Sequence, residues 1–199
     1  MTRTVSALYD TYDAARLAVD ELEAAGIPHS DISIVANNSE NWHHDDARTN
    51  AAGGAGAGAG VGAAVGGVGG LLTGLGIMAI PGVGPVVAAG WLVATAVGAV
   101  AGAAVGGATG SLVGSLTKEG VPEDDANLYA EGVRRGGTLV TARVDDPMET
   151  RARSILQSRK YVDLNARGKI YRDEGWSTFD AAAPAYTAEE VARERARYN

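Results

Sequence analysis

The chain contains no cysteine, and it has only one phenylalanine and three tryptophans among its 199 residues. The absence of cysteine excludes disulfides, thiolate metal sites and a cysteine nucleophile, and it suits a reducing compartment. Few aromatic side chains are available to fill a core, although 46% of the residues are hydrophobic. A net charge of −7 argues against the basic surface that nonspecific nucleic-acid binding requires. We therefore expect no nucleic-acid partner.

Charge is also missing from one long internal stretch. No charged residue lies between Arg48 and Lys118, and this stretch holds 21 of the 28 glycines. Glycine recurs at about every fourth position on both sides of a Pro/Gly turn at residues 81–85, which keeps small residues on one helix face and lets two helices pack closely. The pattern predicts a glycine-zipper helical hairpin over residues 51–117. The positions expected to mediate self-association are Gly54, Gly58, Gly62, Gly66, Gly70, Gly74, Gly90, Gly98, Gly102, Gly106, Gly110 and Gly114.

Two environments are open for this hairpin. Each arm is long enough to cross a bilayer, which takes about 20 residues. The strongly apolar side chains gather near the turn, between Leu71 and Val93, whereas residues 51–66 are almost entirely glycine and alanine. The alternating run at 55–60 also has the period of two of a silk-like sheet. We expect either insertion into a lipid bilayer or a soluble ring, filament or cage-like assembly, and homo-oligomerisation in both.

Strand and helix patterns flank the glycine-rich stretch. Residues 4–9 and 32–36 alternate as strands around a capped helix, which predicts a βαβ unit with parallel strands. After the stretch come a helix that starts at Pro122, a strand at 138–144, a helix from Asp145–Pro147, and a short strand at 160–164. Without the insertion the order is β-α-β-β-α-β. The predicted fold class is therefore α+β, a ferredoxin-like split βαβ sandwich interrupted by the hairpin.

This order sets the expected domain boundaries, and a C-terminal arm follows the sheet domain. The predicted units are the first half of the domain at 1–36, a polar linker at 37–50, the hairpin at 51–117, an accessory helix with the second half at 118–166, and the arm at 167–199. A capping box at Thr187–Glu190 opens a last helix that runs to about Tyr198. The arm either docks on the domain through Trp176, Phe179 and Tyr186 or grips a neighbouring subunit.

No motif predicts an enzyme. The match to G-x-G-x-x-G/A at residues 74–79 has no preceding strand, and neither a phosphate-binding G-x-x-x-x-G-K-[ST] nor a G-x-S-x-G elbow occurs. In the linker, His43, His44, Asp45 and Asp46 could ligate a metal through imidazole and carboxylate groups. A small-ligand or metal-binding module is thus the weaker alternative to a solvated linker. We expect no catalytic residue, no cofactor and no metal.

Several segments carry a family resemblance. They are the strand-helix-strand from Val5 to Val35 before a glycine-rich insertion, the run at 120–140, the segment at 171–176, and the segment at 186–190. Together they resemble the bacterial general stress protein 17M-like (YflT-type) domain family. The resemblance implies a stress-associated, non-enzymatic protein, often labelled a predicted membrane protein, and it supplies no catalytic residues.

Location is inferred from the start of the chain and from the hairpin. The first strand begins at once and leaves no room for a secretory signal. A two-pass hairpin returns both halves of the domain to one compartment. We therefore expect a cytoplasmic domain associated with the inner (cytoplasmic) membrane, or else a soluble cytoplasmic assembly.

Overall fold

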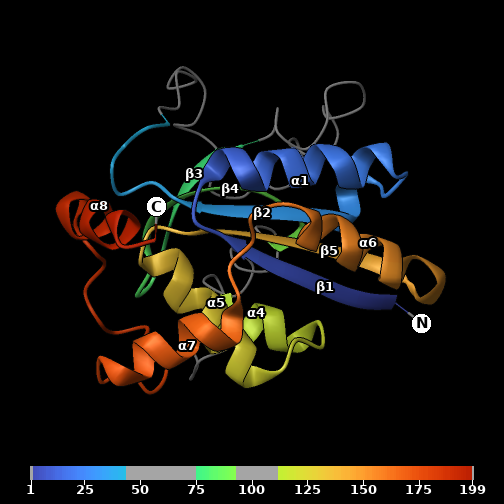
Figure 1. Cartoon of the computed structure of the whole chain (residues 1–199). Helices are drawn as coiled ribbons and strands as arrows, with labels where there is room; N and C mark the ends of the chain where they lie inside the picture. The colour runs from blue at the N-terminus through green and yellow to red at the C-terminus, as the bar shows by residue number, and fades with distance from the viewer. Residues whose placement is uncertain (1, 44–74, 93–111, 199) are drawn as a thin grey trace, which may run out of the picture.

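The structure, a computed structural model, describes residues 2–43, 75–92 and 112–198. Five strands form one antiparallel sheet in the order β1-β5-β2-β4-β3, with helices on both faces (Figure 1). The strands are β1 (Thr2–Tyr9), β2 (Ile32–Asn37), β3 (Gly76–Ile80), β4 (Gly84–Gly90) and β5 (Thr138–Asp145). The helices are α1 (Tyr12–Ala24), α4 (Leu112–Lys118), α5 (Glu123–Arg134), α6 (Asp146–Ser158), α7 (Leu164–Asp173) and α8 (Ala188–Ala196), with a 3-10 turn at His29–Asp31.

Strand β5 is the centre of the sheet. It runs antiparallel to β1 on one side and to β2 on the other, so Ala142 faces both Val5 and Ile32. Strands β1 and β2 are therefore parallel to each other, as the sequence predicted, but β5 separates them. This placement requires residues on both sides of the glycine-rich stretch to meet in one sheet.

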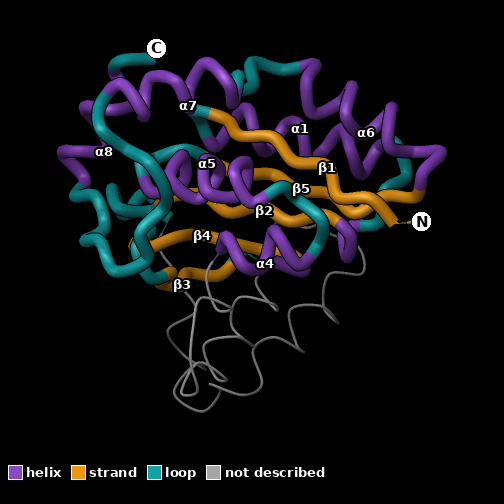
Figure 2. The backbone as a smooth tube through the Cα atoms, turned by 90° about the horizontal axis from the view of Figure 1, so that it is seen from below, coloured by secondary structure: helices purple, strands orange, loops and turns teal. Residues whose placement is uncertain are grey.

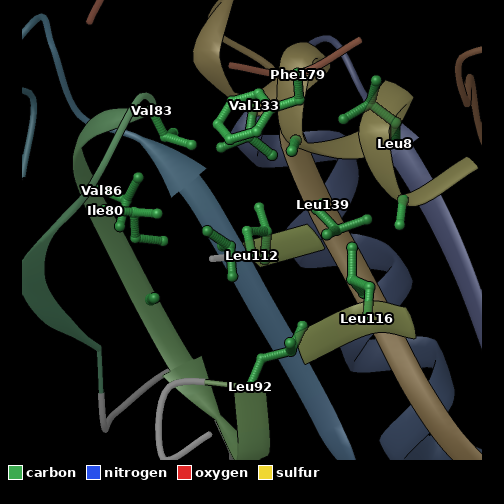
Figure 3. Close-up of a cluster of buried hydrophobic side chains, with 14 of the residues drawn as sticks. Leu8, Ile80, Val83, Val86, Leu92, Leu112, Leu116, Val133, Leu139 and Phe179 are labelled. Atoms are coloured by element: carbon green, nitrogen blue, oxygen red, sulfur yellow. The ribbon is translucent and has the colours of Figure 1, made fainter. Parts of the chain in front are cut away.

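The period-two pattern of the strands divides the core into two layers. Alternate residues of β1, such as Val5 and Tyr9, pack with α1 and α6, and the Tyr9 hydroxyl donates to the Leu156 carbonyl at 2.7 Å. The intervening Leu8 points to the opposite face, where α4 and α5 pack (Figure 3). Fully buried leucines of that second layer include Leu116 of α4. Both faces of the sheet are thus covered by helices.

The predicted helical hairpin is wrong between residues 76 and 90. Strands β3 and β4 form a β-hairpin there, and β4 extends the sheet by pairing with β2. Gly82 (φ +74°) and Gly84 (φ +101°) adopt left-handed backbone angles at the turn, which glycine allows without strain. Val86 and Val87 are both fully buried in the sheet. Here the β-branched residues and the turn outweigh the four-residue glycine period.

Two of the predicted self-association glycines lie in the described residues. Gly90 ends β4 with φ +92°, and Gly114 lies inside the short helix α4. The other ten lie outside the described residues, so their role stays a prediction: Gly54, Gly58, Gly62, Gly66, Gly70, Gly74, Gly98, Gly102, Gly106 and Gly110. None of the described helices combines the length and apolar character that crossing a bilayer requires.

The predicted fourth strand at 160–164 is also wrong. The Val162 amide donates to the Leu8 carbonyl at 2.7 Å, so the segment does reach the outer edge of β1. It stops there because Asp163 caps α7, accepting from the amides of Asn165 (2.9 Å) and Ala166 (3.1 Å). The α+β class is confirmed, whereas the ferredoxin-like arrangement is not, because the sheet gains its extra strands from the glycine-rich stretch instead.

Replacing Gly90 by alanine tests the close approach of β4 to β2. A Cβ at Gly90 would lie 2.1 Å from the Ile32 carbonyl oxygen, and the backbone there is left-handed. We expect Gly90→Ala to lower the free energy of unfolding by at least about 2 kcal/mol. Gly76→Ala, in the same hairpin but with open space around the new Cβ, is the matched control. Equal urea midpoints for the two variants would contradict this packing.

Candidate functional site at the docked C-terminal arm

The C-terminal arm packs along α5 and the turn of the β3–β4 hairpin. The Asn127 side-chain oxygen accepts from the Thr178 hydroxyl (3.0 Å) and from the Phe179 amide (3.1 Å). At the turn, a Cβ on Gly82 would lie 2.7 Å from the Ala181 Cα, so the two backbones touch. Figure 1 shows α8 returning beside the end of the hairpin. Of the two predicted alternatives, the described arm docks on its own chain.

A buried arginine at the end of α5 anchors this arm. Arg135 donates to Glu131 of its own helix (2.7 Å), to Glu174 (2.8 Å) and to Glu194 of α8 (3.4 Å). Its guanidinium carbon lies 4.0 Å from the centre of the Tyr171 ring, within cation–π range. The side chains of Arg135 and Glu131 are 8% and 0% exposed. One cation therefore holds three carboxylates from three segments.

Two more arginines complete what we call the Arg135 cluster: Arg134, Arg135, Arg197, Glu131, Glu174 and Glu194. Arg134 pairs with Glu131 at 3.2 Å, donates to the Pro184 carbonyl at 3.0 Å, and stacks on Tyr186. Arg197 pairs with Glu194 at 2.9 Å and also with Glu174. The cluster contains three cations and three anions, so its charges balance within one chain.

The electrostatics favour the charged forms. Burial alone lowers the pKa of Arg135, but the hydrogen bonds to Glu131 and Glu174 outweigh it, and the net shift is upward. Hydrogen bonds from Arg197 and then Arg135 hold the pKa of Glu174 below its ordinary value. Burial raises the pKa of the Tyr171 phenol, which therefore stays neutral. These shifts keep Arg135 and Glu174 charged and Tyr171 neutral near neutral pH.

Two further arginines tie the arm to loop residues that adjoin the strands of the sheet. Arg167 of α7 makes a two-oxygen contact with Asp10 (2.9 and 3.1 Å), and its guanidinium carbon lies 3.4 Å from the centre of the Tyr198 ring. Arg195 donates twice to the Gly136 carbonyl, at 2.8 and 3.0 Å, and pairs with Glu40. The arm is therefore held at both of its helices.

The Arg135 cluster acts as a clamp, which here means that it holds the C-terminal arm on the domain, and it has no features of a reaction centre. Its arginines and glutamates pair with one another, and no nucleophile lies beside a base there in the way that covalent catalysis requires. Across residues 2–43, 75–92 and 112–198, no three His, Asp or Glu side chains gather closely enough to hold a metal ion. What the cluster can do is fix the arm, α5 and the hairpin turn as one unit.

The linker candidates for a metal are only partly described. Trp42 donates to the Asn37 carbonyl at 2.8 Å and packs on Tyr12, with 4.7 Å between ring centres. His43 lies edge-on to Trp42 at 5.7 Å. His44, Asp45 and Asp46 lie outside the described residues, so the predicted linker site is not tested.

The cluster is not evident in the sequence. Arg134 and Arg135 fit the usual complement of a helix dipole, and that explanation hides the second role of Arg135. The partners Glu174 and Glu194 come from distant segments, and no spacing rule connects them to α5. One local signal was present, because Glu131 lies four residues before Arg135 and next to buried Ala130.

The fold and the clamp define a class: an α+β domain that carries a glycine-rich insertion and a C-terminal arm fastened to its own surface. Residues 4–83 match the family model of the heat induced stress protein YflT domain. This part of the chain is therefore similar to a stress-protein domain of the YflT type, in agreement with the resemblance in its sequence. The match spans less than half of the chain. No curated protein and no solved structure matches.

The buried pair at the centre of the clamp gives a testable prediction. Arg135→Met leaves the fully buried Glu131 without its shortest partner, and we expect a loss of about 3–5 kcal/mol in the free energy of unfolding. Adding Glu131→Leu removes the stranded charge, so the double variant should recover at least half of that loss. Chemical denaturation measures both. A double variant less stable than the single one would contradict this account.

The lowered pKa of Glu174 predicts acid sensitivity of the arm. Because folding lowers this pKa below its ordinary 4.5, the ionised carboxylate stabilises the folded state above that value, and the stabilisation is lost as the pH falls through the folded pKa. The stability advantage of the natural chain over Glu174→Gln should therefore shrink between pH 7 and pH 3. Glu189→Gln, on the exposed side of α8, is the control and should show little change. A constant advantage across that range would contradict the assignment.

Proposed function

We propose that this chain is a non-enzymatic structural protein of the stress response that self-associates through its glycine-rich stretch at 51–117. The stress association is supported by the YflT domain match. The Arg135 cluster has no features of a reaction centre, which is compatible with a structural role, and it supplies a platform by holding the arm in place. Its partner is then another copy of the chain.

The observation that carries this choice is the placement of the most apolar part of the stretch. Val83, Val86 and Val87 are fully buried inside the protein's own sheet and core, and Leu92 is 1% exposed. Of these, Val86, Val87 and Leu92 belong to the strongly apolar group between Leu71 and Val93 that a membrane hairpin would expose to lipid. Since these side chains are buried in the domain, they are not available to lipid. The remainder of the stretch is mostly glycine and alanine, which interact weakly with lipid but allow close backbone packing.

The position of the hairpin turn supports the same choice. A two-pass membrane hairpin with its turn at 81–85 would place that turn in or beyond the bilayer. The turn instead packs against the C-terminal arm, with Gly82 against Ala181 and Gly84 against the Ala185 side chain. Self-association of a cytoplasmic protein is therefore favoured over membrane insertion, and a membrane-bound form is the alternative outcome of the test.

Substitution of four glycines tests the proposal. We expect Leu at Gly66, Gly70, Gly98 and Gly102 together to block close approach and reduce the mass measured by light scattering. Ala at the same four positions keeps the side chains small and is the matched control, which should retain most of the assembly. Unchanged mass in the leucine variant would refute the proposal. Retention of the natural chain in carbonate-washed membranes would replace it with membrane insertion.

A further inference from the structure

Among the described residues, the sheet edge formed by β3 has no backbone partner beyond it. Figure 2 shows β1 and β3 at opposite borders of the sheet. Strand β3 has the sequence Gly-Ile-Met-Ala-Ile, with no charge and no proline. Natural edge strands are usually protected from pairing by lysine, proline, a bulge or a covering segment. The residue Ile77 in this strand is 39% exposed.

The register shows which backbone groups point outward. The Pro85 carbonyl accepts from the Asn38 amide at 2.8 Å, so Pro85 faces β2, and its neighbours Gly84 and Val86 face β3. Their partners in β3 are Ile80 and Met78, which therefore point inward. It follows that Ile77 and Ala79 direct their N–H and C=O groups away from the sheet. Neither residue makes a backbone hydrogen bond beyond the sheet to another described residue.

The other edge is already occupied in part. On β1 the outward carbonyl of Leu8 accepts from the Val162 amide at 2.7 Å, and that of Ser6 accepts from the Tyr129 hydroxyl at 3.0 Å. The same strand carries the charged Arg3, which pairs with Asp146. The two edges therefore differ, and β3 is the one suited to accept another strand.

We propose that β3 pairs antiparallel with β3 of a second copy of this chain, joining two sheets across a twofold axis at Met78. The five-residue strand is complementary to itself in this register. Ile77 of one copy lies opposite Ala79 of the other and exchanges two backbone hydrogen bonds with it, and the symmetric pair makes two more. Because the β1 edge is partly closed and charged, pairing ends at a dimer and does not continue into a fibre.

This dimer contact goes beyond the proposed function, because it uses the sheet edge and none of the glycine positions outside the domain. Because β3 is complementary to itself, the partner that fits this edge is β3 of a second copy of the chain. A strand of the same sequence satisfies every outward donor and acceptor, brings no charge to the uncharged edge, and places each exposed Ile77 beside an alanine. A segment of the same chain covering the edge would prevent the dimer, and the test below detects that outcome.

Single cysteines provide the test, since the natural chain has none. In the proposed register, Met78 faces Met78 in a pair without mutual hydrogen bonds, with Cα atoms about 4.5 Å apart, inside the range that a disulfide spans. The two Ile77 residues are diagonal neighbours about 7–8 Å apart, near or beyond that range. Under a mild oxidant we expect Met78→Cys to give a disulfide dimer on a nonreducing gel, and Ile77→Cys to give several-fold less.

This comparison separates pairing from random collision. Met78 is less exposed than Ile77, so collisions would link the Ile77→Cys variant more, which is the result that overturns the proposal. Ala79→Pro in the Met78→Cys chain removes an outward N–H without touching the β3–β4 ladder, and it should abolish the link. Persistence of the link in that variant, or no link at any protein concentration, also overturns the proposal.

The same cysteine distinguishes this contact from the glycine-rich one. In a Met78→Cys chain that also carries leucine at Gly66, Gly70, Gly98 and Gly102, the disulfide dimer should form at high protein concentration even if larger assemblies disappear. A link that vanishes with the glycines would show that β3 pairing does not stand alone and would overturn the inference. If Met78→Cys in the chain with its natural glycines gives no disulfide dimer while the larger assemblies still form, the proposed function stands and only the β3 dimer is refuted.

Discussion

Strand β5 lies between β1 and β2, and the pairing of Ala142 with both Val5 and Ile32 is the constraint on which the other elements depend. The first half of the chain supplies two parallel strands that cannot form a continuous sheet until the third strand arrives from beyond the glycine-rich stretch. The closure entropy of that long connection grows slowly with length, by only about 0.6 kcal/mol for each doubling. A long insertion is therefore tolerated between β2 and β5. The family match at 4–83 ends before β5, so the matched segment needs the rest of the chain to complete its sheet.

The insertion is itself part of the domain. Its middle provides β3 and β4, which widen the sheet beyond β2, and its end provides α4, which packs beside α5 on the face opposite α1. Two properties of glycine matter at Gly82 and Gly90: it adopts left-handed backbone angles, and it lets a neighbouring backbone approach closely. A four-residue period in the sequence reveals neither property, because both depend on the contacts of the individual glycine.

Sequence patterns were sufficient where local chemistry agreed with the tertiary contacts. The strand alternation of β1, the acidic first turn of α5 and the capping box at Thr187–Glu190 of α8 were all readable from neighbouring residues. The hairpin at 76–90 was not, because its valines are buried by pairing with β2, which no short-range period reveals. The strand predicted at 160–164 was wrong for a local reason, because Asp163 caps α7 and the cap outweighs a weak strand pattern. The Arg135 cluster needed long-range contacts that only the fold brings together.

The Arg135 cluster and the two layers of helices show which surfaces of the described residues are already used within the chain. The Arg135 cluster uses its own carboxylates and arginines to hold the arm, and α1, α4, α5 and α6 cover the two faces of the sheet. Buried ion pairs contribute little net stability compared with apolar packing, but losing one partner is costly, so such a cluster fixes one arrangement. That fixed arrangement places the hairpin turn against the arm. It leaves β3 at the border of the sheet, where the backbone N–H and C=O groups of Ile77 and Ala79 point away from β4. A rigid edge keeps its donors and acceptors aligned before any partner arrives, which reduces the ordering cost of association. The physical connection between the clamp and assembly is therefore preorganisation: the arm holds the turn, and the turn holds the strand that a second copy can pair with.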